Sequence, residues 1–137
     1  TGHPYPFAPD KRPYHSLSPT LALYPRGEFA FTLGTPGGDS QTQTILQITH
    51  NMLVFGMTPQ QAIEAPRFRS LSGLRLAIED RVSEEALLDL RQRGHLLNLV
   101  EGWTATFGGA HMIHHDPETG VLTAAADPRR EAYAIAY

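Results

Sequence analysis

The chain has 137 residues, of which 41% are hydrophobic and 18% are charged. This composition is typical of one globular domain or a piece of a larger one, and not of a disordered segment. Eleven lysines and arginines against fourteen aspartates and glutamates give a net charge of −3, which offers no basic surface for nucleic acid. The sequence contains no cysteine, which excludes disulfides and cysteine nucleophiles, and no apolar run approaches the roughly 20 residues of a membrane-spanning helix.

The first 19 residues contain five of the eleven prolines and are predicted to form an extended N-terminal arm. An N-terminal threonine can act as a nucleophile with its own α-amine as base. Such a threonine opens a central strand, whereas Pro4, Pro6 and Pro9 exclude ladder pairing here, so we do not expect this role for Thr1. Because the chain has neither an initiator methionine nor the regions of a signal peptide, we expect it to be processed or cut from a longer one.

Two short apolar segments, residues 20–24 and 29–33, flank a turn that contains glycine and predict a β-hairpin. A glycine-rich turn follows, and after it an apolar stripe predicts a helix that ends at Gly56, with Asp39 or Ser40 as its N-cap. The stripe consists of Ile45, Ile48, Met52 and Phe55.

A second helix is expected to begin at Thr58 and Pro59 and to stop before Pro66. The remaining predicted elements are an extended segment over 67–79 with alternating apolar side chains, a helix from Ser83 to Gly94, and strands over 96–100, 110–114 and 121–126. Because antiparallel hairpins with helices between them pack as layers, this order predicts an α+β fold in which helices cover a sheet.

The glycine corner, Gly34-Thr-Pro-Gly-Gly-Asp39, joins the end of a predicted strand to the start of a predicted helix. The first turn of a helix presents free backbone N–H groups, and paired glycines let a substrate oxygen approach them closely. The corner therefore suits an oxyanion or anion site, although residue chemistry alone favours a tight strand-to-helix turn with no ligand, since paired glycines are common at such turns. No lysine follows at the spacing of a phosphate-binding loop.

The second candidate segment, residues 11–19 of the arm, holds a cation, an imidazole and two hydroxyls within nine residues. Hydroxyls on a proline-braced loop can donate hydrogen bonds to a ligand carboxylate. The alternative is a surface arm whose hydroxyls bond to its own backbone.

A cluster of histidines near the C-terminus is a weaker candidate for metal binding. On a strand, His111 and His115 share a face while His114 points away, so only two imidazoles and Asp116 can converge. Because zinc usually takes three or four protein ligands, we expect no metal here.

Four motifs follow one another along the chain. They are Arg-Pro-x-x-Ser-x-x-Pro at 12–19, Gly-x-Pro-Gly-Gly at 34–38, a segment at 51–68 that ends in Ala-Pro-Arg-Phe, and Asp-Pro-Arg at 127–129. In order and spacing they resemble the C-terminal part of the small subunit in the γ-glutamyltransferase family. The resemblance is closer to the amidohydrolase- and acylase-like branch, because His15 stands where transpeptidases carry the first of two serines.

The resemblance implies part of an αββα N-terminal-nucleophile hydrolase sandwich, with antiparallel sheets covered by helices. Residues 1–19 would be an arm carrying the substrate clamp, and residues 20–137 the C-terminal portion of the small subunit. Family members transfer a γ-glutamyl group from an amide to water or an amino acid through a threonine acyl-enzyme. By resemblance, Gly37 and Gly38 bind the oxyanion, Ser16 and His15 contact the substrate, and no cofactor is required.

The threonine nucleophile of the family is absent from this chain, so we expect the isolated chain to be inactive. Its expected partners are a large subunit, the missing N-terminal part of the small subunit, and a γ-glutamyl or related amide substrate. Unpaired strand edges predict self-association of the isolated piece. The alternative is a non-catalytic binding or assembly module. The family resemblance implies a periplasmic or secreted transpeptidase, or a cytoplasmic amidohydrolase-like enzyme, and the sequence does not decide between them.

Overall fold

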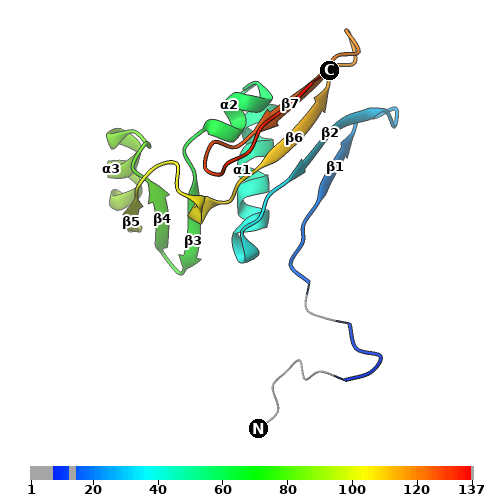
Figure 1. Ribbon diagram of the computed structural model, residues 1–137. Coiled ribbons are helices and arrows are strands. Elements are labelled where there is room, and N and C mark those ends of the chain that lie inside the picture. Colours follow the sequence, from blue (N-terminus) through cyan, green and yellow to red (C-terminus); the bar gives the residue numbers. More distant parts are fainter. Residues whose placement is uncertain (1–7, 13–14, 137) are drawn as a thin grey trace.

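The computed structural model describes residues 8–12 and 15–136, which form two β-sheets and the helices that accompany them (Figure 1). In the four-stranded sheet the order is β1-β2-β6-β7, and all three pairings are antiparallel. Its strands are β1 (Thr20–Leu23), β2 (Phe29–Gly34), β6 (His111–His115) and β7 (Leu122–Ala126). The strands of the second sheet, in the order β3-β4-β5, are β3 (Phe68–Ser72), β4 (Arg75–Glu79) and β5 (Leu96–Val100).

The predicted hairpin is confirmed as β1 and β2. Ala22 pairs with Phe31 and Leu23 with Phe29, so apolar residues of the two segments face one another, with a shift of register between Ala22 and Leu23. The turn closes through two backbone hydrogen bonds of 2.8 Å that link Tyr24 with Gly27 and Glu28.

The helices α1 (Gln41–Leu53) and α2 (Pro59–Glu64) lie against one face of the four-stranded sheet (Figure 1). Ile48 of the predicted stripe is fully buried, but Phe55 is wrongly assigned to it. Helix α1 ends at Leu53, and Phe55 remains 64% exposed. The α2 prediction is confirmed: Thr58 and Gln61 form a capping box that satisfies two backbone N–H groups at the helix start.

The prediction of one extended segment over 67–79 is also wrong, because Gly73 adopts φ 55° and turns the chain between β3 and β4. The alternation predicted for β4 does not occur either. Residues 76–79 are all buried, since this strand lies in the middle of its sheet. Strand β5 runs parallel to β4, and the helix α3 (Glu84–Gln92), which Ser83 caps, supplies the crossover that a parallel pair needs. The second sheet is therefore mixed and not purely antiparallel.

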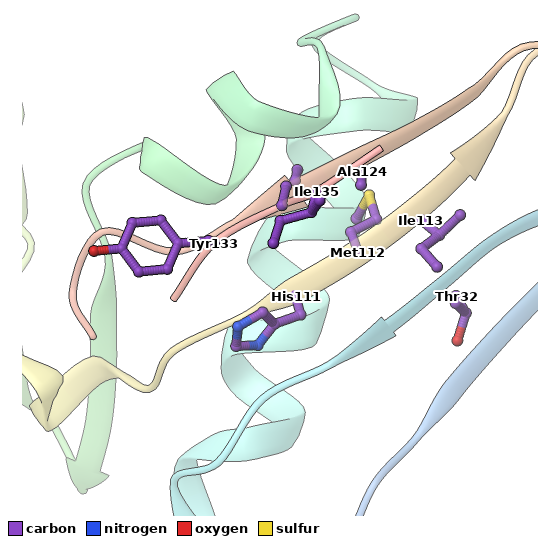
Figure 2. Close-up of a pocket in the computed structure, with 9 residues that line it drawn as sticks. Thr32, His111, Met112, Ile113, Ala124, Tyr133 and Ile135 are labelled. Atoms are coloured by element: carbon purple, nitrogen blue, oxygen red, sulfur yellow. The ribbon is translucent and has the colours of Figure 1, made fainter. Parts of the chain in front are cut away.

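The main core lies between the four-stranded sheet and helices α1 and α2. Its largest fully buried apolar side chains are Leu33, Ile48 and Ile63. The opposite face of the same sheet remains open and carries exposed apolar side chains, namely Leu21, Leu23, Ile113 and Leu122. A pocket of about 280 Å³ lies on this face. Figure 2 shows that Tyr133 and Ile135 of the C-terminal segment line it together with His111 and Ile113 of β6.

Candidate active site

The glycine corner turns the chain sharply between β2 and α1. Gly37 adopts φ 145° and Gly38 adopts φ 53°, and a short 3-10 turn, η1 (Gly38–Ser40), leads into α1. A Cβ atom on Gly37 would lie 2.6 Å from the Ser40 Oγ, so a side chain there would displace this hydroxyl. Glycine is therefore favoured at position 37 by the backbone path and by packing, and at position 38 by the backbone path alone.

Two hydroxyls hold the carbonyl oxygens of the corner. Thr35 Oγ1 donates to the Pro36 carbonyl at 2.9 Å, and Ser40 Oγ donates to the Gly37 carbonyl at 2.8 Å. In a trans peptide the N–H points opposite to the C=O, so the Gly37 and Gly38 N–H groups point away from these hydroxyls. Within the described residues neither N–H has an acceptor. The corner therefore presents two adjacent backbone donors.

Ser40 occupies the N-cap position of α1, as predicted, but its side chain does not cap the helix. It is 1% exposed and donates backward to Gly37, so it accepts no N–H from α1. Asp39 lies in the 3-10 turn that precedes the helix. The Ser40 hydroxyl therefore stabilises the glycine corner and does not cap the start of α1.

The arm lies against the start of α1. Gln41 is 4% exposed, and its Oε1 accepts the backbone N–H of Ser18 at 3.1 Å. The Ser18 hydroxyl donates to the Ser16 carbonyl at 3.5 Å. These contacts fix residues 16–18 beside the corner, although the two elements are more than twenty positions apart in sequence.

The arm and the corner enclose a pocket of about 330 Å³, which we call the polar pocket. It is lined by His15, Ser16, Leu17, Ser18, Gly38, Asp39 and Thr42. The structure thus brings together three of the four residues predicted for the site, His15, Ser16 and Gly38. The fourth, Gly37, precedes Gly38 in the chain and is not among the lining residues. Thr1, Pro13 and Tyr14 lie outside the described residues.

Sequence reasoning missed Asp39 and Thr42 as pocket residues. Among the lining residues that the structure describes, Asp39 is the only carboxylate and none is a lysine or an arginine. Thr42 could have been found from helical spacing, because it lies one turn after Gly38. No sequence signal places Asp39 toward the arm, and the N-cap pattern alone gave a different role.

The last two motifs meet in a buried cluster that we call the ion network, formed by Arg67, Glu79, Asp127 and Arg129. Arg67 Nη1 lies 2.7 Å from Asp127 Oδ2, and Arg129 makes two contacts with Glu79, at 2.6 and 2.9 Å. All four side chains are at most 4% exposed. The network joins β4, α2 and the end of β7, so its role is structural.

The charges in the ion network shift one another's pKa values. Burial alone would raise the pKa of Asp127, but the charge of Arg67 and N–H groups from Ala110 and Arg129 outweigh it and lower the pKa. Burial likewise opposes ionisation of Glu79, but hydrogen bonds and charge from Arg129 lower its pKa. Both carboxylates are therefore held in their ionised form.

The predicted histidine cluster forms no metal site in the described part of the chain, where no three histidine or acidic side chains converge. His115 Nδ1 lies 3.0 Å from the Phe29 carbonyl, and His111 lines the pocket on the open sheet face. Among the described residues there is also no helix long and apolar enough to cross a membrane.

With this geometry established, comparison with known proteins identifies the family. The family model described as gamma-glutamyltranspeptidase matches residues 1–137. The chain therefore belongs to this family, as the motifs predicted. It is 36% identical over 134 residues to the glutathione hydrolase-like YwrD proenzyme of Bacillus subtilis, covering 93% of this chain and 25% of that protein. It is 30% identical over 140 residues to the oxamate amidohydrolase proenzyme of Klebsiella pneumoniae, covering 98% of this chain and 26% of that protein.

Solved structures of this family share the fold of the chain. The gamma-glutamyltranspeptidase from Pseudomonas nitroreducens superposes with a TM-score of 0.80 at 24% identity, over 96% of this chain and 67% of that one. The T380A mutant of the Helicobacter pylori enzyme superposes with a TM-score of 0.79 at 27% identity, over 90% and 66%. Relatives named amidohydrolase and acylase confirm the predicted branch. The chain spans about a quarter of the length of its curated relatives.

Proposed function

We propose that this chain is the C-terminal part of the small subunit of a γ-glutamyltransferase-like enzyme. The enzyme transfers a γ-glutamyl or related acyl group from an amide to water or an amino acid. The observation that carries the proposal is the polar pocket, in which His15 and Ser16 of the arm face the Gly38 backbone. An outward N–H pair beside a hydroxyl-lined pocket is the geometry that acyl transfer requires.

In the proposed reaction, a threonine hydroxyl supplied by polypeptide outside these residues attacks the amide carbonyl. The carbonyl oxygen becomes negative as the new C–O bond forms, and the Gly37 and Gly38 N–H groups donate to it. The C–N bond then breaks, and the amine leaves with a proton. Water or an acceptor amine attacks the ester and restores the threonine hydroxyl.

Ser16 and His15 hold the other end of the acyl group in this proposal. The Ser16 hydroxyl is half-buried and can donate to a carboxylate or an amide oxygen, and His15 lies at the pocket rim. Imidazole in place of a second hydroxyl changes the hydrogen-bond pattern that the substrate meets. This supports a donor related to those of the amidohydrolase-like branch and not only glutathione.

The open face of the four-stranded sheet supports the proposed αββα sandwich. Leu21 of β1, Thr32 of β2, Ile113 of β6 and Ala124 of β7 are cross-strand neighbours on this face. Leu21 is 66% exposed and Ile113 is 43% exposed. We propose that a second sheet, from the missing part of the small subunit and the large subunit, covers this surface. Alone, the chain is expected to self-associate through it.

The proposal is tested by comparing the full-length proenzyme with the isolated 137-residue chain on a γ-glutamyl anilide. We expect self-cleavage and anilide hydrolysis by the proenzyme and no turnover by the isolated chain. Hydrolysis by neither protein, or equal hydrolysis by both, would contradict the proposal. Calorimetry of the isolated chain with glutamate tests the alternative of a binding module, because tight binding without turnover by either protein would favour it.

A further inference from the structure

We propose that Thr35 and Gly108 are positioning residues for the Gly37 and Gly38 N–H groups. The inference rests on the proposed function, and it concerns two residues that no motif marked as part of the site. Thr35 belongs to the glycine corner, and Gly108 follows the 3-10 turn η2 (Ala105–Phe107) more than seventy residues later. The two meet directly behind the donors.

The Thr35 hydroxyl uses both of its hydrogen-bonding capacities in this contact. It accepts the Gly109 N–H at 3.1 Å and donates to the Pro36 carbonyl at 2.9 Å. Because the Pro36 carbonyl shares a peptide plane with the Gly37 N–H, the hydroxyl sets the direction in which that N–H points. One side chain therefore both anchors the corner and orients its first donor.

Gly108 provides the surface on which the corner rests. It adopts φ 95°, and a Cβ atom there would collide with the Thr35 hydroxyl and lie 3.0 Å from the Pro36 carbonyl. A Cβ on Gly37 would in turn lie 3.9 Å from the Gly108 Cα. The two backbones are therefore in close contact, and an added Cβ at position 108 would displace the Thr35 hydroxyl and press on the Pro36 carbonyl.

The segment 107–110 is itself rigidly held. The Phe107 carbonyl accepts from Arg67 Nη1 at 2.9 Å and from Thr44 Oγ1 at 3.3 Å, and the Ala110 N–H donates to Asp127 Oδ2 at 2.9 Å. Two members of the ion network thus fix the platform under the corner. Through segment 107–110, the buried charges of the ion network therefore help to fix the positions of the Gly37 and Gly38 N–H groups.

The consequence concerns the transition state and not substrate affinity. A small displacement of oxyanion donors lowers the rate of the chemical step, because the charge on the oxygen develops only there. Thr35 is not among the residues that line the polar pocket, so we expect binding of the acyl group to His15 and Ser16 to change little. A change at Thr35 should therefore lower kcat while KM stays nearly constant.

The test uses the full-length proenzyme with Thr35→Val, which keeps the shape of the side chain and removes both hydrogen bonds. Thr35→Ser is the matched control that keeps the hydroxyl. With a γ-glutamyl anilide we expect Thr35→Val to lower kcat about tenfold or more, with KM within about twofold. Thr35→Ser should retain most of kcat. Equal losses in both variants, or a loss only in KM, would overturn the inference.

Gly108→Ala gives an independent test, with Gly120→Ala as control because Gly120 also has a positive φ, 73°, and no atom near its Cβ position. We expect Gly108→Ala to lower kcat more than Gly120→Ala. The two kcat values are compared at a temperature well below the thermal midpoint of each variant, where both proteins are folded. Equal effects on kcat would contradict the assignment.

A readout that does not need activity separates this inference from the proposed function. In the 137-residue chain, amide NMR shifts of Gly37 and Gly38 should move in Thr35→Val and stay close to wild type in Thr35→Ser. If the proenzyme hydrolyses no amide but these shifts behave as expected, only the proposed function fails. Unchanged shifts in Thr35→Val would overturn the positioning role itself.

Discussion

The ion network and the glycine corner differ in whether their polar groups have hydrogen-bond partners inside the protein. In the network, Asp127 accepts from Arg67, from two backbone N–H groups and from Arg129, and it is fully buried. In the corner, the Gly38 N–H has no acceptor within the described residues and faces a pocket. Polar groups that are satisfied inside the protein hold the fold together, whereas donors left pointing outward are available to a ligand.

Both regions nevertheless depend on side chains that bond to backbone carbonyls. Arg129 reaches the Ile63 and Ala65 carbonyls at 2.9 Å, much as Ser40 reaches Gly37. In the network these bonds complete a buried cluster of charges. In the corner they turn carbonyls inward and so turn N–H groups outward. Hydrogen bonds from side chains to backbone carbonyls therefore stabilise the fold in the ion network and expose N–H donors in the glycine corner.

The largest expected effect comes from breaking the ion network. Glu79→Ala leaves Arg81 without its carboxylate partner and leaves Arg129 with only its contact to Asp127, and removing one member of a buried pair typically costs about 3–5 kcal/mol. Urea denaturation should show this loss. The control is Asp89→Ala, which breaks an exposed pair with Arg93 and should leave the midpoint nearly unchanged. Similar losses in the two variants would show that burial of the network is not what stabilises the fold.

The next effect comes from the corner and appears in activity. Gly38→Val in the proenzyme should lower kcat on a γ-glutamyl anilide by about 10²–10³-fold, because a β-branched residue cannot hold φ 53° and the N–H groups move. Gly73→Val is the matched control, since Gly73 has φ 55° and equally open surroundings. It should cost similar stability and leave kcat unaffected. Equal kcat in wild type and Gly38→Val would remove Gly38 from the oxyanion role.

A graded effect should follow pH. The pKa values of Asp127 and Glu79 are lowered in the folded protein, so the unfolded chain binds more protons in acid. Their stabilisation is therefore complete above about pH 5, beyond the ordinary carboxylate values near 4, and is lost as pH falls through the folded values. Urea midpoints measured from pH 7 to pH 3 should fall steeply only below about pH 4. Asp127→Asn should show a shallower acid slope, and an unchanged slope would exclude Asp127 as its source.

Local elements were predictable from the sequence because their signals are local. Thr58 and Gln61 form a capping box from residues three positions apart, and residues 25–28 form a turn of their own. The break at Gly73 was missed because the neighbouring leucines fit a continuous strand as well as they fit a hairpin. The parallel pairing of β5 with β4 depends on how α3 packs, and no strand pattern encodes that.

The candidate site shows the same division between local and long-range signals. Residue chemistry and family motifs predict roles for the glycine pair and for the hydroxyls of the arm. The contact of Thr35 with Gly109 spans 74 positions, and the contact of Arg129 with Glu79 spans 50. Such contacts follow from the order of strands in the two sheets, so a single sequence does not show them. The Asp-Pro-Arg motif could be recognised, but its structural role could not.

The smallest expected effect concerns the charge of Asp39 in the polar pocket. Unlike the network, the polar pocket has a carboxylate, Asp39, with no arginine or lysine among its lining residues to balance it. A donor that carries a carboxylate is therefore repelled, and a neutral donor is not. In the proenzyme, Asp39→Asn should lower KM for a glutaryl anilide, which carries a carboxylate and no ammonium, by about two- to fivefold, the size expected for an exposed charge pair.

A neutral acyl anilide should show no such change, and the gain for the anionic donor should shrink in high salt, where exposed charges are screened. Asp89→Asn, a charge change outside the pocket, serves as the control for net charge. If Asp39→Asn improves both donors equally, the carboxylate acts on the shape of the pocket and not on its charge. The unbalanced charge of Asp39 would then have no effect on which donor the enzyme prefers.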